Sequence, residues 1–258
     1  MTHRAVEVLS SVALILAEDT RHSRRLLDHY HISTSLSPYH EHNEAKATPT
    51  VVGRLVAGES IALISDAGTP LISDPGSRLV AAAVEAKVPV VPIPGASSVM
   101  AALVASGMSL ERFTFFGFLP RKGRERHEMI ADIVACNSTA VLFEAANRVS
   151  ATLDALEDAG AGERSVVVAR ELTKQFEEFK RGSVSELASV YRDADPKGEV
   201  VLVMAGAEKK RMSEGELTNA AREIRAAGGA PREVMEHLVT TLGASRNLAY
   251  KIAHEGES

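Results

Sequence analysis

The first half of the chain alternates short apolar runs with amphipathic stretches, the pattern of strands that are each followed by a helix. We expect strands at residues 12–17, 61–64 and 88–93. We expect helices at residues 20–29, 48–57, 76–86 and 96–105, the second with Pro49 in its first turn and the last closed by Gly107. Repeated strand–helix order favours a mostly parallel sheet with helices on its faces.

The pattern changes after a strand at residues 113–118. Strands at 139–143, 165–170, 177–181 and 200–204 alternate with helices at 124–135, at 148–158 and from about 185, which predicts a second α/β unit of mixed strand direction. A charged helix at 213–226 with a capping box, then helices at 231–241 and 245–254, form a tail. The last two, joined by a glycine turn, resemble a helix-turn-helix, although a small hairpin packed on the body is the favoured interpretation. We therefore expect α/β domains at 1–111 and 112–208 and a helical tail at 209–258.

Composition adds limits to this picture. The chain has 258 residues, 45% of them hydrophobic, a formal net charge of −5 and one cysteine. A single cysteine excludes an intrachain disulfide and fits a reducing, cytoplasmic setting, and no apolar stretch reaches membrane-spanning length. The charge argues against a general nucleic-acid coat protein but leaves room for RNA binding by local basic patches. Three such patches exist, at residues 21–25, 121–127 and 209–211.

Two rigid polar loops follow neighbouring strands. Residues 65–76 read SDAGTPLISDPG and come directly after the strand at 61–64; residues 94–98 read PGASS and follow 88–93. Ligands of open α/β sheets bind outside the carboxyl ends of the strands, so the two loops are expected to form walls of one small-molecule pocket.

Other polar groups are expected at the same edge. Glu18, Asp19 and Arg21 follow the strand at 12–17, where Asp19 can equally be read as a helix N-cap. A dense polar segment at residues 39–44 lies in a long connection. No pattern of metal ligands stands out, because a third partner for His40 and His42 is not apparent.

Several of these segments, in order along nearly the whole chain, resemble a known family. They read AEDTRH at 17–22, HEHNE at 40–44, SDAGTPLISDPG at 65–76, PGASS at 94–98, GFLPRKG at 117–123, RELTK at 170–174 and KGE at 197–199. The chain is similar to the 16S rRNA (cytidine 2'-O)-methyltransferases, the ribosomal small-subunit methyltransferase I group of the tetrapyrrole methylase superfamily.

The resemblance implies two α/β domains with a cleft between them, S-adenosylmethionine as methyl donor, a homodimer, and the ribose 2'-hydroxyl of 16S rRNA or the small ribosomal subunit as acceptor. The implied donor-binding residues are Asp66, Gly68, Thr69, Pro94, Gly95, Ala96, Ser97 and Ser98. The implied RNA-binding residues are Arg21, Glu41, Asn43, Arg121, Lys122, Arg124, Arg126, Arg170 and Lys174. Glu18, Asp19 and His22 are candidates for the general base that receives the hydroxyl proton, and the sequence does not choose among them.

Two departures from the family pattern stand out. Members open with a strand and a Gly-Asn-Leu-Gly loop, whereas Met1 falls about where the following helix begins; we expect either a start codon placed too late or a truncated chain that lacks the first strand. The family's Glu-Ser-Pro-His-Arg turn reads EAANR at 144–148 and lacks the imidazole. Two alternative functions therefore stay open: a corrin or porphyrin methyltransferase, and a non-catalytic RNA-binding relic.

Overall fold

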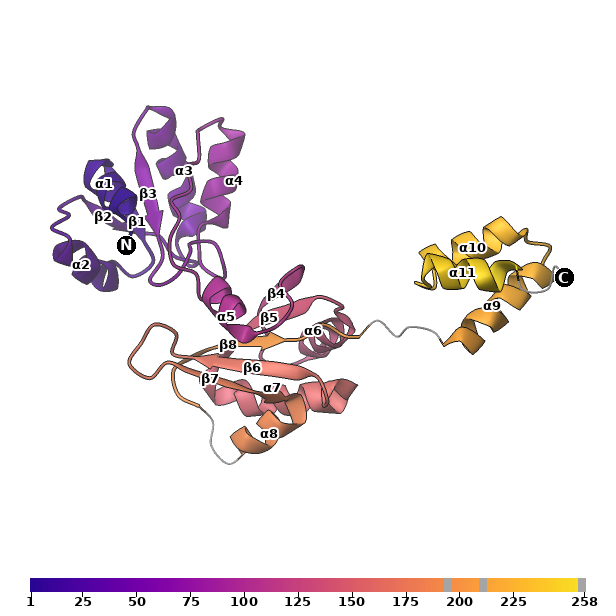
Figure 1. Cartoon of the computed structure of the whole chain (residues 1–258). Coiled ribbons are helices and arrows are strands. Elements are labelled where there is room, and N and C mark those ends of the chain that lie inside the picture. Colours follow the sequence, from indigo (N-terminus) through magenta and orange to yellow (C-terminus); the bar gives the residue numbers. More distant parts are fainter. Residues whose placement is uncertain (193–195, 209–212, 255–258) are drawn as a thin grey trace. The chain divides into compact units, whose positions relative to one another are not determined.

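The computed structural model describes residues 1–192, 196–208 and 213–254, and the basic patch at 209–211 lies outside these ranges. The chain divides into two compact units, Met1–Ala207 and Glu208–Ser258. The first unit contains two sheets (Figure 1).

The first sheet has three parallel strands in the order β2-β1-β3. They are β1 (Leu14–Ala17), β2 (Leu36–Pro38) and β3 (Ile61–Ile64). Ala17 is level with Pro38 in β2 and with Ile64 in β3, so all three strands end together. The residues that follow the three strands therefore lie at one edge of the sheet.

Helices cover both faces of this sheet, because the strand side chains alternate between two apolar clusters. Ile15 packs with Leu9 of α1 (His3–Ser11) and Leu27 of α2 (Thr20–His29). Leu14 and Leu16 pack instead with α3 (Glu44–Val56) and α4 (Ser77–Glu85). The α/β class with parallel strands predicted for this half is confirmed.

Several details of the prediction are wrong or incomplete. Residues 88–93 form no strand, and Val90 and Val91 are exposed. A strand needs a neighbour for its amides and carbonyls, and among the described residues no strand pairs with this segment, so its strong β-propensity is not realised. Helix α3 begins four residues before Thr48, which places Pro49 inside the helix rather than in its first turn. The pattern analysis also predicted neither α1 nor β2.

The second sheet is mixed, as predicted, in the order β4-β5-β8-β6-β7. Its strands are β4 (Phe113–Phe118), β5 (Thr139–Ala145), β6 (Ser165–Arg170), β7 (Glu178–Ser183) and β8 (Glu199–Met204). β4 runs parallel to β5, and β8 runs antiparallel to both β5 and β6. The carboxyl ends of β4, β5 and β6 therefore share one edge with the beginning of β8.

Four helices cover this sheet. Three of them, α6 (Arg124–Ala135), α7 (Val149–Leu156) and α8 (Val184–Arg192), pack on one face, where short helices at Ala146–Arg148 and Glu157–Ala161 flank α7. On the other face α5 (Ser98–Ser106) packs its Val99, Ala102 and Leu103 against Val141 and Val203. Gly107 closes α5 in the left-handed conformation, as the sequence predicts. The expected boundary at 111/112 stays a prediction, and α5 on its amino-terminal side packs with the second sheet.

The second unit contains α9 (Glu214–Ala226), α10 (Pro231–Thr240) and α11 (Arg246–His254). Leu217, Val234 and Ile252 are fully or almost fully buried in an apolar cluster formed by these helices alone. The capping box of Ser213 and Glu216 is confirmed. The unit thus has its own core.

Candidate active site

Three carboxylates gather where the strands of the first sheet end. Glu18 follows β1, and Asp66 and Asp74 belong to the loop after β3. A carboxylate oxygen of Asp66 accepts a hydrogen bond of 3.2 Å from the backbone N–H of Asp19, which ties the two strand ends together. Asp74 is within electrostatic range of both other acids and accepts a hydrogen bond from Ser65.

The charges of Glu18 and Asp74 are incompletely compensated, because the pKa of each carboxyl lies above its ordinary value. Burial raises the pKa of Glu18, the charges of Asp74 and Asp66 raise it further, and His40 opposes them. Burial also raises the pKa of Asp74; the Ser65 hydrogen bond lowers it, and the charge of Asp66 adds to the rise. A cluster whose ionised forms are disfavoured in this way would be stabilised by a cationic ligand.

The two loops that the sequence assigns to one pocket touch each other. The Thr69 hydroxyl donates a hydrogen bond of 3.0 Å to the backbone carbonyl of Ala96, 27 residues along the chain. Ser97 caps α5 by accepting a hydrogen bond from the backbone N–H of Met100. The Asp66 and Gly95 loops thus lie together, as expected from their positions after neighbouring segments.

The 65–76 loop also holds strained backbone. Leu71 and Ser73 have φ values of +73° and +64°, a region that costs a non-glycine residue about 1–3 kcal/mol. These two residues turn the chain back so that Asp74 returns to Asp66. Gly76, at φ +125°, has no room for a side chain because Leu63 occupies the position of a Cβ. Strain of this kind is typical of loops that hold a ligand.

The loop approaches the second sheet at Gly117 in β4. A Cβ at Gly117, whose φ is +68°, would lie 3.6 Å from the Ser73 hydroxyl oxygen. The segment GFLPRKG, expected to face RNA, therefore begins beside the loop expected to hold the donor.

Asp19 has a structural task at the start of α2. Its carboxylate accepts hydrogen bonds from the backbone N–H groups of Arg21 and His22 and pairs with the Arg21 guanidinium at 3.0 Å. The hydrogen bonds from Arg21 lower the pKa of Asp19 to about 2. The N-cap interpretation of Asp19 is thus confirmed. His22 and Arg21 are exposed at this helix start.

The polar segment after β2 forms a turn. The Asn43 side chain accepts a hydrogen bond of 2.9 Å from the His40 N–H and donates one of 3.0 Å to the Pro38 carbonyl. Asn43 therefore shapes the turn, while Glu41 is exposed on it. Below the turn, the buried Tyr39 hydroxyl bonds to Thr48 at 2.7 Å.

The basic loop after β4 divides into outward and inward groups. Arg121, Lys122 and Arg124 are exposed, and Arg124 pairs with Glu128. Arg126 differs from the expectation of an outward phosphate contact. Its side chain is 13% exposed and donates hydrogen bonds to the Pro120 carbonyl and the Thr152 hydroxyl. Helical periodicity turns Arg126 toward the protein, where buried Glu144 lies 3.9 Å away.

Arg170 and Lys174, the remaining expected RNA-binding residues, take part in ion pairs. Arg170 pairs with Glu178 at 3.2 Å, and Lys174 pairs with Glu171 and Glu199 at 2.9 and 3.1 Å. Gly198, at φ +94°, lets the chain pass against the Glu171 carboxylate. These residues fix the strand ends at the edge that also carries the basic loop.

Sequence reasoning did not name Asp74 or His40 as members of the carboxylate cluster, although it quoted the segments that contain them, and it did not name Glu144 as the buried partner of Arg126. The duplicated Ser-Asp of the 65–76 loop was a usable signal for Asp74, because a returning loop brings its two acids together. His40 belongs to the polar segment expected at this edge, and the pairing of β2 with β1 explains why it lies near Glu18. Glu144 lies in a mostly apolar strand, where an acid demands a buried partner.

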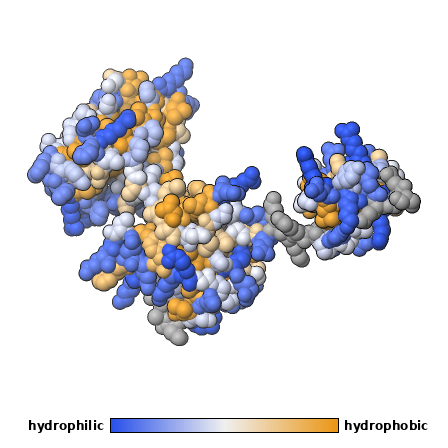
Figure 2. Space-filling view, in the orientation of Figure 1, coloured by the Kyte–Doolittle hydropathy of each residue, from blue (hydrophilic) through white to orange (hydrophobic). Residues whose placement is uncertain are grey.

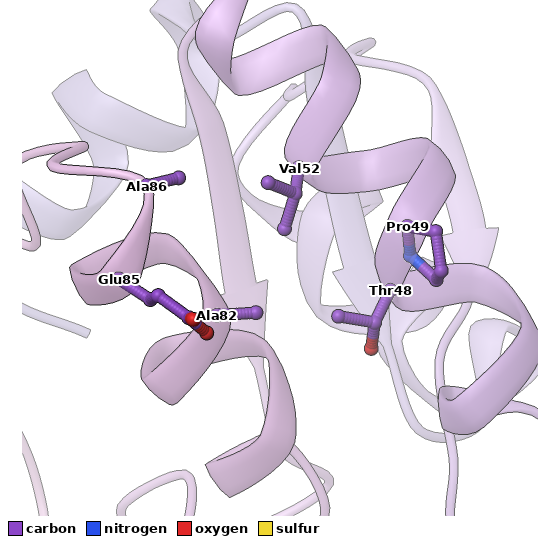
Figure 3. A pocket seen from close by; sticks show the side chains of 6 residues that line it. All are labelled: Thr48, Pro49, Val52, Ala82, Glu85 and Ala86. Carbon is purple, nitrogen blue, oxygen red and sulfur yellow. The ribbon is translucent and has the colours of Figure 1, made fainter.

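A separate hollow of about 340 Å³ lies between α3 and α4 (Figure 3). Thr48, Pro49 and Val52 face Ala82, Glu85 and Ala86 across it. Its lining is mainly aliphatic and has one carboxylate, so it lacks the convergent polar groups of a reaction site. The carboxylate cluster is the better candidate.

Comparison with known proteins identifies the family. The profile of the tetrapyrrole (corrin/porphyrin) methylases matches residues 1–188. A ribosomal RNA small subunit methyltransferase I of Synechocystis sp. is 43% identical over all of this chain and 94% of its own length. The enzyme of that name from Vibrio cholerae is 45% identical over 80% of this chain and 72% of its own length.

Solved structures show the same fold at low identity. A diphthine synthase superposes with a TM-score of 0.60 at 15% identity, covering 80% of this chain and 84% of its own. A Thermus thermophilus uroporphyrin-III C-methyl transferase, solved in complex with S-adenyl homocysteine, superposes with a TM-score of 0.55 at 15% identity. The match covers 80% of this chain and 90% of that one. Within the residues that the structure describes, no helix is both long and apolar enough to cross a bilayer. The chain belongs to the ribosomal RNA small subunit methyltransferase I family, a branch of the tetrapyrrole methylases.

Proposed function

We propose that this protein methylates the ribose 2'-hydroxyl of a cytidine in 16S rRNA, with S-adenosylmethionine as the methyl donor. The observation that carries the proposal is the full-length similarity to a small-subunit rRNA methyltransferase at 43% identity. The structural neighbours support the fold, and their low identity gives no argument for a porphyrin as acceptor.

The carboxylate cluster fits the donor. S-adenosylmethionine carries a sulfonium and an ammonium, and Glu18 and Asp74 supply incompletely compensated negative charge next to the carboxylate of Asp66. Thr69, the 94–98 turn and Gly68 complete the proposed donor-binding set, since the Thr69–Ala96 hydrogen bond joins these loops. When bound, the donor supplies an electrophilic methyl group whose bond to sulfur breaks as the new oxygen–carbon bond forms.

The protein must align the hydroxyl, exclude water and accept its proton. Glu18 suits the last task better than Asp19, because its raised pKa makes it the stronger base, whereas that of Asp19 is lowered to about 2. His22 is exposed at the same helix start and is the second candidate. We propose Glu18 as proton acceptor.

The exposed Arg121, Lys122, Arg124 and Arg21 are proposed to bind RNA phosphates. The exposed Glu41 is proposed to accept hydrogen bonds from donor groups of the RNA, because a carboxylate repels a phosphate. Phosphate contacts make affinity fall with salt. Arg126, Arg170, Lys174 and Asn43 are proposed to act on RNA binding indirectly, because their polar groups already hold the loops.

The test uses the purified chain, labelled S-adenosylmethionine, and either 30S subunits or naked 16S rRNA lacking the modification. We expect a cytidine methylated on its ribose after nuclease digestion and mass spectrometry. Transfer to uroporphyrinogen but not RNA would refute the proposal. So would salt-dependent RNA binding with no melting shift on adding the donor, which is the behaviour of a relic.

We further propose that the protein works in the cytoplasm as a homodimer. Helix α5 is apolar all round: its inner face packs on the sheet, and its outer Met100 and Val104 are 49% and 69% exposed. Figure 2 shows apolar surface where α5 lies. Light scattering should give a dimer mass, and Val104→Asp should lower it; a monomeric wild-type chain at micromolar concentration would refute the proposal.

A further inference from the structure

Phe118, at the end of β4, is a large apolar side chain left 54% exposed beside the candidate active site. Scattered exposed apolar residues are ordinary, but a phenylalanine has no polar atom to share with water. Phe118 lies between the proposed donor-binding loop at 65–76 and the basic loop after β4, so its exposed ring is placed to contact a bound ligand.

An irregularity in β4 sets the direction of this side chain. The pairing with β5 shifts between Phe115 and Phe118, and Gly117 between them has φ +68°. Strict alternation would send residues 115 and 118 to opposite faces of the sheet. The bulge instead places Phe118 against Phe143, with ring centroids 5.2 Å apart, on the face where Phe143 also meets Phe115. Bulges commonly re-aim a side chain beside an active site.

The neighbours of Phe118 belong to both halves of the proposed reaction. On one side, Gly117 approaches Ser73 of the 65–76 loop. On the other, the exposed Arg121 and Lys122 follow three and four residues later. Exposed cations that follow closely on an exposed aromatic residue are a combination that binds single-stranded nucleic acid, the cations through phosphates and the ring through a base.

We propose that Phe118 stacks on a base of the RNA substrate and so holds an unpaired nucleotide at the methyl donor. The inference rests on the proposed function for the identity of the substrate. Stacking is sequence-tolerant, so Phe118 contributes to affinity and positioning rather than to the choice of base.

The test compares Phe118→Ala, Phe118→Leu and Phe118→Tyr in the full chain. Phe113→Ala is the matched control, because Phe113 is a 42% exposed phenylalanine at the opposite end of β4. RNA affinity is measured without donor by fluorescence anisotropy, together with KM for RNA, the donor Kd and the melting temperature. We expect the alanine and leucine variants to weaken RNA binding by about 5- to 150-fold, and the tyrosine variant to bind like the wild type.

The donor Kd should be unchanged in all four variants. The melting temperature of Phe118→Tyr should match that of the wild type, and loss of the contact with Phe143 should lower that of Phe118→Ala by only a few degrees. Wild-type affinity of Phe118→Leu, an equal loss in Phe113→Ala, or a weaker donor Kd would each overturn the inference. A wild-type chain that binds RNA without methylating it would refute the proposed function alone, since the anisotropy arm needs no turnover.

Discussion

The buried Glu144 offers the sharpest test of how the basic loop is held. Its side chain is fully buried at the end of β5 and has two cationic neighbours, Arg148 at 3.3 Å and Arg126 at 3.9 Å. It also accepts hydrogen bonds of 2.6 Å from Thr152 and 2.9 Å from the Ala145 N–H. Arg148 in turn donates to the carbonyl oxygens of residues 119 and 120, where the loop starts.

Glu144→Gln keeps the shape of the side chain and removes the charge. Burial lowers the pKa of Arg126, the charge of Glu144 opposes that effect, and the charge of Arg148 adds to it. Without the Glu144 carboxylate, the charges of the Arg126 and Arg148 guanidinium groups would repel each other without compensation. Removing one partner from a buried ionic group costs about 3–5 kcal/mol. In a unit of this size that corresponds to a fall of roughly 6–20 °C in melting temperature.

Differential scanning calorimetry at pH 7 measures the fall. The control is Glu59→Gln, which removes the acid of a more exposed pair with Arg54 and should leave the melting temperature unchanged. An unchanged melting temperature for Glu144→Gln would show that the two arginines are not held by this charge, and the structural role given to Arg126 would be wrong.

Two further predictions concern the strand ends. Burial and the charges of Asp74 and Asp66 raise the pKa of Glu18 above 4.5 in the folded protein. The folded state therefore binds this proton more tightly than the unfolded state does. The resulting stabilisation is complete at a pH below the pKa of Glu18 in the unfolded chain, and it is lost as the pH rises through the pKa of Glu18 in the folded protein. Glu18→Gln should therefore melt higher than the wild type at pH 7, with no difference at pH 3 and with reduced kcat; equal melting at pH 7 would contradict the assignment. Gly198→Ala, where a Cβ would overlap the Glu171 carboxylate at φ +94°, should destabilise the chain by about 1–3 kcal/mol in urea unfolding. Its control, Gly215→Ala, has open space in α9 and should instead be neutral or slightly stabilising.

Much of the fold follows from local pattern. The boundaries of α2, β3, β4, α6 and β6 agree with those expected, because each combines a clear periodicity with a cap or turn residue at its end. The meeting of the 65–76 and 94–98 loops was also predicted, and the Thr69–Ala96 hydrogen bond confirms it, although the strand expected at 88–93 as the basis for it is absent.

What failed depends on partners that are distant in the sequence. Residues 88–93 have the composition of a strand, yet a strand exists only where another strand accepts its hydrogen bonds. Arg126 looked like its exposed neighbours in a basic run, and only the position of Glu144 on another element reveals that it points inward. The geometry of the acidic cluster likewise depends on the fold of the 65–76 loop. Asp74 returns to Asp66 through Leu71 and Ser73, and the left-handed backbone conformation of these two residues does not follow from their residue types.

The free side of β3 has a practical consequence. Within the described part of the chain, β3 pairs with β1 alone, so one row of its amides and carbonyls faces outward next to apolar side chains. Such a row is a template on which a foreign extended segment can add. A lysine introduced on this margin should disfavour such pairing, because its charge would have to be buried against the added segment.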